Sequence, residues 1–128
     1  MRLLLDTHAF LWWLADDPRL SRRVRTLLGA VENELFLSSA SAWEIATKHR
    51  LRKLPDAASV LTDFSAVLVD QHITPLAITV EHALEAGRLP AKHRDPFDRM
   101  LAAQSRLEGL PLVTDDQALQ GLAAETIW

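Results

Sequence analysis

Four carboxylates from separate parts of the sequence stand at the expected ends of strands and helices. These are Asp6, Glu44, Asp98 and Asp116. Asp6 and Asp116 come shortly after apolar runs that are typical of buried strands, while Glu44 and Asp98 fall in the first turn of expected helices. Crowded carboxylates raise one another's pKa, and divalent cations that prefer oxygen, such as Mg²⁺ and Mn²⁺, relieve their repulsion. Because such a metal activates water and neutralises charge on a phosphate, the pattern favours phosphodiester hydrolysis.

The stretch around Asp98 predicts a helix with a defined beginning. Asp95 is the expected N-cap, Pro96 the first helical residue and Asp98 the third. Apolar residues then recur at helical spacing, with Arg99 and Arg106 on the opposite side. Asp98 lies on the flank between these faces, where a carboxylate can reach a cleft. Taken alone, the two acids are explained as well by ordinary helix capping.

Each of the other acids also has a simpler structural explanation. Asp6 fits a cap for the helix that follows it. Glu44 fits the third position of a capping box that begins at a serine, and it can pair with Lys48 one turn later. Asp115 and Asp116 fit a turn and a cap before the last helix, and only one of the two is expected to face a cleft. The convergence of all four positions at one edge of a sheet is what favours a metal site.

Hydrophobic periodicity predicts an α/β fold in which a central parallel sheet of four to five short strands has helices on both faces. The expected strands cover residues 2–5, 35–37, 73–76, 110–113 and, at an edge, 126–128. The expected helices cover residues 9–14, 21–31, 41–51, 57–69, 81–86, 96–109 and 117–122. Gly87 is the expected cap that ends the helix over 81–86. Ligands of such sheets bind outside the carboxyl ends of the strands, where Asp6 and Asp116 are expected.

The composition is that of one ordinary globular domain with a small negative charge. The chain has 128 residues, a formal net charge of −3 and no cysteine. Thiol catalysis and thiolate zinc sites are therefore excluded, and a simple basic nucleic-acid binder is disfavoured. If the four acids bind cations, the net charge of the remaining residues is close to zero. A substrate that carries phosphate is then compatible with the composition. The first apolar run is too short for a signal peptide, and we expect a soluble, cytoplasmic protein that does not interact with membranes.

Four motifs occur in a familiar order along the whole chain. They are Leu5-Asp6-Thr7-His8, Ser41-Ala42-Trp43-Glu44-Ile45, Asp95-Pro96-Phe97-Asp98-Arg99-Met100-Leu101 and Leu112-Val113-Thr114-Asp115-Asp116. Together they resemble PIN-domain proteins, and most of all the VapC-type toxins of bacterial toxin–antitoxin pairs. The resemblance covers residues 1–128 as one PIN-like domain.

The resemblance implies a metal-dependent ribonuclease with an acidic pocket on a parallel sheet. Asp6, Glu44, Asp98 and Asp116 are the acids that match, as both the metal ligands and the catalytic residues, with Mg²⁺ as the cofactor and Mn²⁺ as a substitute. Asp98 is preferred to Asp95 because the third acid of the family directly precedes an apolar helical segment. Asp116 is preferred to Asp115 because the fourth acid falls two residues after the threonine. The implied partners are an RNA substrate, a cognate antitoxin protein that covers the acidic pocket, and a second copy in a homodimer.

Several interpretations stay open beside the ribonuclease. The main alternative is a noncatalytic PIN-like module that binds RNA or a protein. A phospho-receiver domain and an Asp-nucleophile phosphatase both fit poorly, because the first strand is followed by a single acid in Asp6-Thr7-His8. The histidines show no spacing typical of a metal site, and we assign none of them. Five basic residues are expected either to guide RNA or to form a solvated face, namely Arg50, Arg52, Lys53, Lys92 and Arg94.

Overall fold

A parallel sheet forms the centre of the protein, whose computed structural model describes residues 1–90 and 92–128. Its strands are β1 (Arg2–Leu5), β2 (Glu34–Ser38), β3 (Ile73–Leu76), β4 (Leu112–Val113) and β5 (Thr126–Ile127). They form a five-stranded sheet in the order β3-β2-β1-β4-β5, and every neighbouring pair is parallel. The predicted parallel sheet, with an edge strand at the C-terminal end of the chain, is therefore confirmed.

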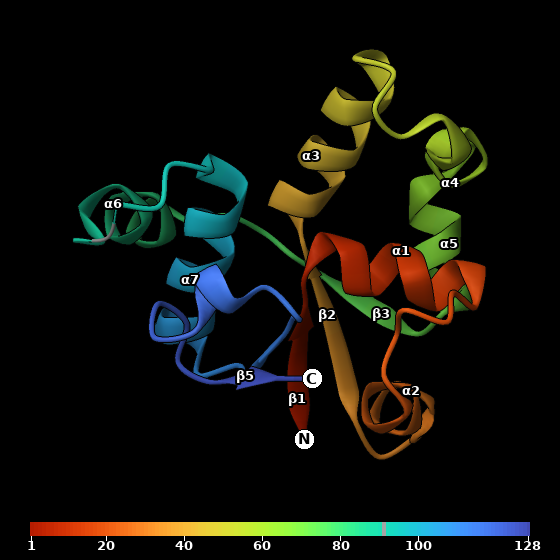
Figure 1. Cartoon of the computed structure of the whole chain (residues 1–128), viewed down its shortest axis with the longest axis horizontal. Coiled ribbons are helices and arrows are strands. Elements are labelled where there is room, and N and C mark those ends of the chain that lie inside the picture. Colours follow the sequence, from red (N-terminus) through yellow and green to blue (C-terminus); the bar gives the residue numbers. More distant parts are fainter. Residues whose placement is uncertain (91) are drawn as a thin grey trace.

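Helices cover both faces of this sheet (Figure 1). The α-helices are α1 (Thr7–Ala15), α2 (Arg22–Gly29), α3 (Ser39–Arg50), α4 (Ala58–Thr62), α5 (Phe64–Asp70), α6 (Val80–Arg88) and α7 (Pro96–Glu108). Two short 3₁₀ turns, η1 (Pro55–Ala57) and η2 (Gln117–Leu119), complete the described elements. Within the described residues, no helix combines the length and the apolar character needed to cross a membrane.

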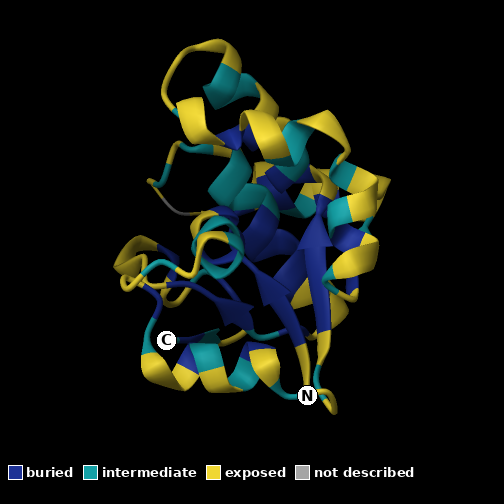
Figure 2. Ribbon diagram, turned by 90° about the vertical axis from the view of Figure 1, so that its right-hand side faces the viewer, coloured by how far each residue is buried: buried dark blue, intermediate teal, exposed yellow. Residues whose placement is uncertain are grey.

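Alternate residues of the strands supply two separate hydrophobic cores. In β1, Leu3 and Leu5 pack on the face that also buries Phe10 of α1, whereas Leu4 packs on the opposite face with Leu101 of α7. Figure 2 shows the strands as a buried layer between the partly exposed helices. Full burial of each leucine contributes about 2 kcal/mol, and the two-sided coverage explains why the strands read as continuous apolar runs.

The order of the strands creates a switch point beside β1. The chain passes from β1 to β2 and β3 on one side, and later to β4 and β5 on the other. Open parallel sheets bind ligands at the carboxyl ends of the strands around such a point. Asp6 directly follows β1 and Thr114 directly follows β4, and the Asp6 backbone N–H donates to Val113 O at 3.0 Å. The candidate site is thus attached to the most buried strands.

The prediction of a capping box formed by Ser41 and Glu44 is wrong. Helix α3 already begins at Ser39, and the hydroxyl of Ser38 is its N-cap, accepting from Ala40 N at 3.0 Å. The extended backbone of Ser38 leads from β2 into α3 without a loop, so the earlier serine takes the cap. Glu44 is consequently the sixth residue of the helix, and its side chain points into the protein instead of back to the cap.

Three other predicted helices differ from the structure. The single helix over 57–69 is interrupted at Asp63, whose φ of −146° is not helical and whose side chain caps α5. Helix α6 continues through Gly87 to Arg88, so this glycine does not end the helix as predicted. The last helix is only the 3₁₀ turn η2. In each case side-chain caps and local packing decided a boundary that periodicity alone does not specify.

The predicted beginning and end of α7 are confirmed. Asp95 is the N-cap, and its carboxylate accepts from Phe97 N at 2.9 Å and from Asp98 N at 3.4 Å. Pro96 is the first helical residue. Gly109 ends the helix with a φ of 64°, a left-handed conformation that a side chain would strain. Asp98 therefore lies in the first turn, as expected from the sequence.

Candidate active site

Asp6 begins helix α1 at the end of the central strand. Its carboxylate accepts a hydrogen bond from Ala9 N at 2.7 Å, which makes Asp6 the N-cap of the helix. The side chain is almost fully buried, and burial raises the pKa of Asp6 from 3.8 to about 6. A hydrogen bond from Thr114 opposes this rise, while the negative charge of Asp115 adds to it. A buried carboxylate that binds protons this readily is also disposed to bind a cation.

Glu44 of α3 is buried and held by two neighbouring groups. The Thr7 hydroxyl donates to Glu44 Oε1 at 2.5 Å, and Lys48 Nζ lies 2.5 Å from Glu44 Oε2. Thr7 Oγ1 also lies 3.0 Å from Ser41 Oγ, so residues of α1 and α3 form one buried polar network. Thr7 directly follows Asp6, and this network therefore joins the first and second acids of the site.

Lys48 is the cation that pairs with the buried Glu44. Burial disfavours its ammonium group, but the hydrogen bond to Glu44 and the charges of Glu44, Asp95 and Asp98 outweigh that effect and raise the pKa of Lys48. The predicted pair between Glu44 and Lys48 is thus present, and in a much more buried setting than a surface contact.

Asp98 faces the site from the first turn of α7. It is partly buried, and burial raises its pKa, as do the nearby charges of Asp95 and Glu44. His93 opposes this rise, since its Nε2 lies 2.8 Å from Asp98 Oδ2. The effect of Glu44 on the pKa of Asp98 shows that these two carboxylates, from α3 and α7, lie within electrostatic reach of each other.

Asp116 and Asp115 both border the site, but next to different partners. Donor atoms of Asp116, Asp98 and His93 all lie within 4.8 Å of one another, the only such group of three among residues 1–90 and 92–128. Asp115 instead raises the pKa of Asp6. Asp116 caps η2, accepting from Ala118 N at 2.9 Å, so the predicted capping role is present as well. The geometry places Asp116, and not Asp115, beside Asp98.

His93 is a site residue that the sequence interpretation did not assign. It precedes the N-cap Asp95, and its backbone carbonyl accepts from Arg99 Nη1 at 2.8 Å. Arg99 also donates to the carbonyls of Ala86 (2.9 Å) and Leu89 (2.7 Å), which fixes the end of α6 against the start of α7. The sequence signal that could have identified His93 is its position five residues before Asp98. The chain bends at a helix cap, and this bend returns the preceding segment toward the first turn.

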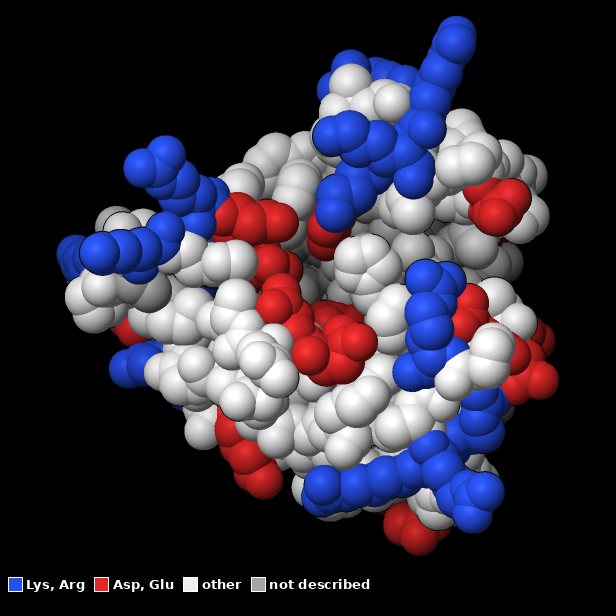
Figure 3. Space-filling view, viewed as in Figure 1, with Lys and Arg blue, Asp and Glu red and all other residues white. Residues whose placement is uncertain are grey.

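Acidic side chains gather on one face of the protein, with basic side chains around them. Figure 3 shows acidic side chains at the centre of this face and Lys and Arg side chains at several places on its rim. Unlike Lys48, which is partly buried, the five basic residues predicted to guide RNA lie on the surface. Arg50, Arg52, Lys53, Lys92 and Arg94 are all exposed to solvent. A phosphodiester chain crossing this face would meet cations on both sides.

A family comparison agrees with this geometry. The family model of the PIN domain matches residues 3–125. The chain belongs to the PIN-domain family. Within that family the relationship is to VapC-type proteins. Ribonuclease VapC22 of Mycobacterium tuberculosis is 30% identical over 119 residues, which cover 92% of this chain and 89% of that protein.

Two solved structures share the PIN-domain fold of this chain. One is VapBC2 from Rickettsia felis bound to a DNA fragment from their promoter, with a TM-score of 0.69 and 14% identity over 100% of this chain and 98% of that chain. The other is a toxin–antitoxin complex from Klebsiella pneumoniae, with a TM-score of 0.60 and 14% identity over 98% and 96%. At these identities the likeness concerns the fold alone.

A divalent metal is the cofactor that the PIN-domain family implies, and the residues present fit one. Three potential donor atoms already converge, two of them carboxylate oxygens, from Asp98, Asp116 and His93. Burial raises the pKa of both Asp6 and Asp98, because the charged carboxylate is disfavoured away from water. A bound cation would stabilise that charge. Oxygen ligands with net negative charge suit hard divalent cations.

Proposed function

We propose that this PIN-domain protein is a Mg²⁺-dependent endoribonuclease that hydrolyses single-stranded RNA and acts as the toxin of a toxin–antitoxin pair. The arrangement of the acids carries the proposal. Asp98 lies close to Asp116 and within electrostatic reach of Glu44. Asp6 is buried where the central strand ends. A ribonuclease of the VapC type with 30% identity supports the reaction class.

Asp6, Glu44, Asp98 and Asp116 are the residues that would hold the metal. Bound there, Mg²⁺ would supply an activated water and charge neutralisation at the scissile phosphate. The remaining residues hold this set in place: Thr7 orients Glu44, His93 orients Asp98, and Lys48 forms an ion pair with Glu44. The exposed basic residues 50, 52, 53, 92 and 94 bind the phosphates that flank the cut.

The proposed partners are an antitoxin and a second copy of the chain, and the proposed location is the cytoplasm, where the RNA substrate is. An apolar surface patch supports a homodimer. Trp43 is 59% exposed although its ring packs edge-on against Phe97, with centroids 4.7 Å apart. Beside it a cavity of about 200 Å³ is lined by Ile78 and Met100. Exposed apolar surface of this kind marks a protein interface.

The function is tested by Mg²⁺ titration with a single-stranded RNA and the variant Asp6→Asn. We expect cleavage by the wild type that requires Mg²⁺ or Mn²⁺, and a loss of at least about a hundredfold in the variant, because the amide cannot supply a negative charge to the metal. Asp63→Asn is the matched control, since Asp63 is also an Asp N-cap, accepting from Ala66 N at 3.1 Å, but is exposed and on α5.

Cleavage that persists in Asp6→Asn would contradict the metal mechanism. RNA binding without cleavage by the wild type, at any concentration of Mg²⁺ or Mn²⁺, would instead identify the alternative, a noncatalytic PIN-like binding module.

A further inference from the structure

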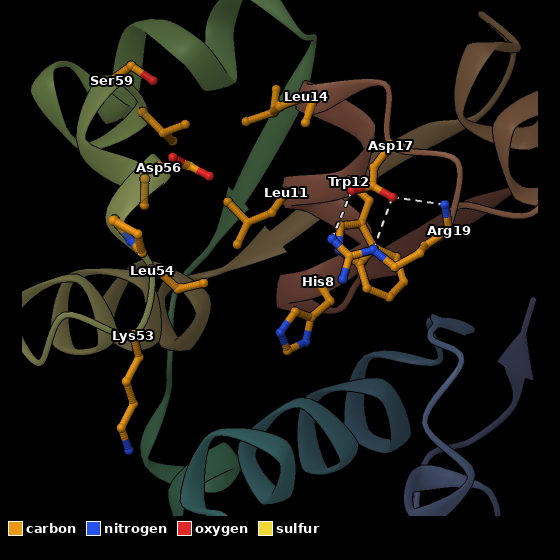
Figure 4. A pocket seen from close by; sticks show the side chains of 14 residues that line it. His8, Leu11, Trp12, Leu14, Asp17, Arg19, Lys53, Leu54, Asp56 and Ser59 are labelled. Atoms are coloured by element: carbon orange, nitrogen blue, oxygen red, sulfur yellow. Dashed lines mark hydrogen bonds and ion pairs between the residues drawn. The ribbon is translucent and has the colours of Figure 1, made fainter.

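A second cavity lies between α1 and the segment that follows α3. It has a volume of about 420 Å³, which is within the range of small-ligand sites. Figure 4 shows its two walls, with His8, Leu11 and Trp12 on the α1 side and Lys53, Leu54 and Ser59 on the other. Of the residues that line it, only Lys53 has been given a role above, as one of the phosphate-binding cations.

The cavity approaches the first acid of the site through His8. His8 lines it and lies two residues after Asp6, close enough for its charge to lower the pKa of that carboxyl. Arg19 also lines it, and its pKa is raised mainly by the hydrogen bond to Asp17 and to a smaller extent by the charge of Asp115. A strand bound across Asp6 would therefore pass close to this cavity.

One wall of the cavity carries two rings and a guanidinium group packed against one another. The Arg19 guanidinium lies 4.7 Å from the Trp12 ring centroid, and its Nε and Nη2 bond to the two carboxylate oxygens of Asp17 at 3.0 and 2.8 Å. The His8 ring lies 5.7 Å from the same indole, inclined by 40°. Aromatic and guanidinium planes are the surfaces on which unpaired bases stack.

The opposite wall offers hydrogen-bonding groups at the rim of an apolar floor. Lys53, Asp56 and Ser59 are exposed there, and the floor includes Leu11 and Leu54. A base has this same division, with apolar faces and a polar edge. Carboxylates accept from exocyclic amino groups, and ammonium groups bind phosphates.

We propose that this cavity binds one unpaired nucleobase of the RNA strand next to the cleavage site, and that it sets the base preference at that position. The base stacks on the His8, Trp12 and Arg19 wall, Asp56 and Ser59 read its edge, and Lys53 contacts its phosphate. This inference rests on the proposed ribonuclease function. A nucleotide is favoured over a partner helix because His8, two residues after Asp6, lines the cavity, and because Arg19 and Lys53 place cations on both walls.

The test compares two tryptophan substitutions on α4. Ser59→Trp fills the cavity from an exposed position, whereas Ala58→Trp adds the same side chain at an exposed neighbouring residue that does not line it. The wild type and both variants are given a randomised pool of single-stranded RNA with Mg²⁺, and the cleaved ends are sequenced. We expect the preference at one position to fall about tenfold in Ser59→Trp and to be unchanged in Ala58→Trp.

Asp56→Asn provides a second, less bulky variant. An amide both donates and accepts hydrogen bonds, so we expect it to change which base is preferred at that same position, without flattening the preference. Identical preferences in the wild type, Ser59→Trp and Asp56→Asn would overturn the proposal.

Photo-crosslinking distinguishes failure of the cavity from failure of the enzyme. RNA carrying 4-thiouridine is irradiated with the wild-type protein in EDTA, and the crosslinked residues are mapped. Crosslinks to His8 or Leu54 support the base site even if no cleavage is found, and crosslinks elsewhere contradict it. If Ser59→Trp weakens binding of a cognate antitoxin but leaves RNA crosslinking unchanged, the cavity belongs to a protein partner and the proposal is wrong.

Discussion

Buried charge is the dominant feature of the site at the level of single residues. Asp6 is 6% exposed and Glu44 is 3% exposed, yet only Glu44 has a cation bound to it, Lys48. Burial away from water is the main reason that the pKa of Asp6 rises to about 6. In the absence of a bound metal, Asp6 therefore costs stability at neutral pH, which is typical of residues retained for function.

The variant Asp6→Asn is expected to be more stable than the wild type at neutral pH in EDTA. The pKa of Asp6 is raised from 3.8 to about 6, so its favourable contribution to folding is full below about pH 4 and is lost as the pH rises through about 6. The amide removes this loss, and we expect a gain of about 2–3 kcal/mol at about pH 8 that vanishes below about pH 4. Urea unfolding across this pH range measures it. A variant less stable than the wild type at every pH would contradict the assignment.

Loss of the Lys48 ammonium is expected to leave a buried carboxylate unpaired. Lys48→Met keeps the aliphatic stem but removes the partner of Glu44, and we expect a loss of about 2 kcal/mol in the free energy of unfolding. Because a bound divalent cation replaces the missing charge, added Mg²⁺ should recover more stability in this variant than in the wild type. Thermal unfolding with and without Mg²⁺ measures both effects, with the exposed Lys53→Met as control. Equal melting temperatures for Lys48→Met and Lys53→Met would refute the pairing argument.

At the level of elements, four helix or turn beginnings position the site. Asp6 caps α1, Ser38 caps α3, Asp95 caps α7 and Asp116 caps η2. A cap fixes the first turn of its helix, and the first turn of α7 carries Asp98. The same acidic residues that satisfy free backbone N–H groups thus also aim carboxylates at one edge of the sheet. Capping and metal binding are compatible interpretations of Asp6 and Asp116.

Substitutions of Asp95 can separate its role as the N-cap of α7 from a role in RNA cleavage. Asp95→Ala removes acceptors for Phe97 N and Asp98 N, and we expect a loss of about 1 kcal/mol in stability together with weaker RNA cleavage. Asp95→Asn keeps the cap, so its stability should change by only a few tenths of a kcal/mol. Cleavage rates and urea unfolding of the two variants are compared. Full activity in Asp95→Asn indicates a cap alone, and strong loss there would show that the charge of Asp95 itself is needed.

At the level of the whole molecule, the acids and the apolar patch lie on adjoining parts of α3 and α7. Glu44 and Trp43 are consecutive in α3, and Phe97 directly precedes Asp98 in α7. The edge-on packing of Trp43 against Phe97 therefore joins the proposed dimer face to the two helices that carry site acids. Movement at this face would also displace Glu44 and Asp98, because each helix moves as a rigid unit.

Trp43→Glu is expected to convert a dimer into a monomer. A charge at the centre of the patch would be desolvated by the partner copy, which disfavours association by several kcal/mol. Light scattering coupled to size-exclusion chromatography measures the mass. Val31→Glu is the control, since Val31 is 99% exposed and lies outside α3 and α7. A wild-type monomer, or a dimer that survives Trp43→Glu, would exclude this face.

The sequence by itself determined the layers of the fold and the backbone ends at which the acids stand. Apolar runs such as Leu3–Leu5 favour buried strands, and Asp95-Pro96 favours the beginning of a helix, because both signals arise from neighbours in the chain. The tertiary structure alone decided that α3 begins at Ser39 and that the helix expected over 57–69 is broken at Asp63.

The structure also decided which partners the acids have. Apart from the pair of Glu44 and Lys48, which helical spacing predicts, it brought His93 to Asp98, Thr7 to Glu44, and Asp116 to the pair of His93 and Asp98. These choices depend on how elements distant in sequence pack together, and the energies that decide them are long-range contacts and burial. Local propensity carries no information about such contacts, whereas it is sufficient for caps and strands.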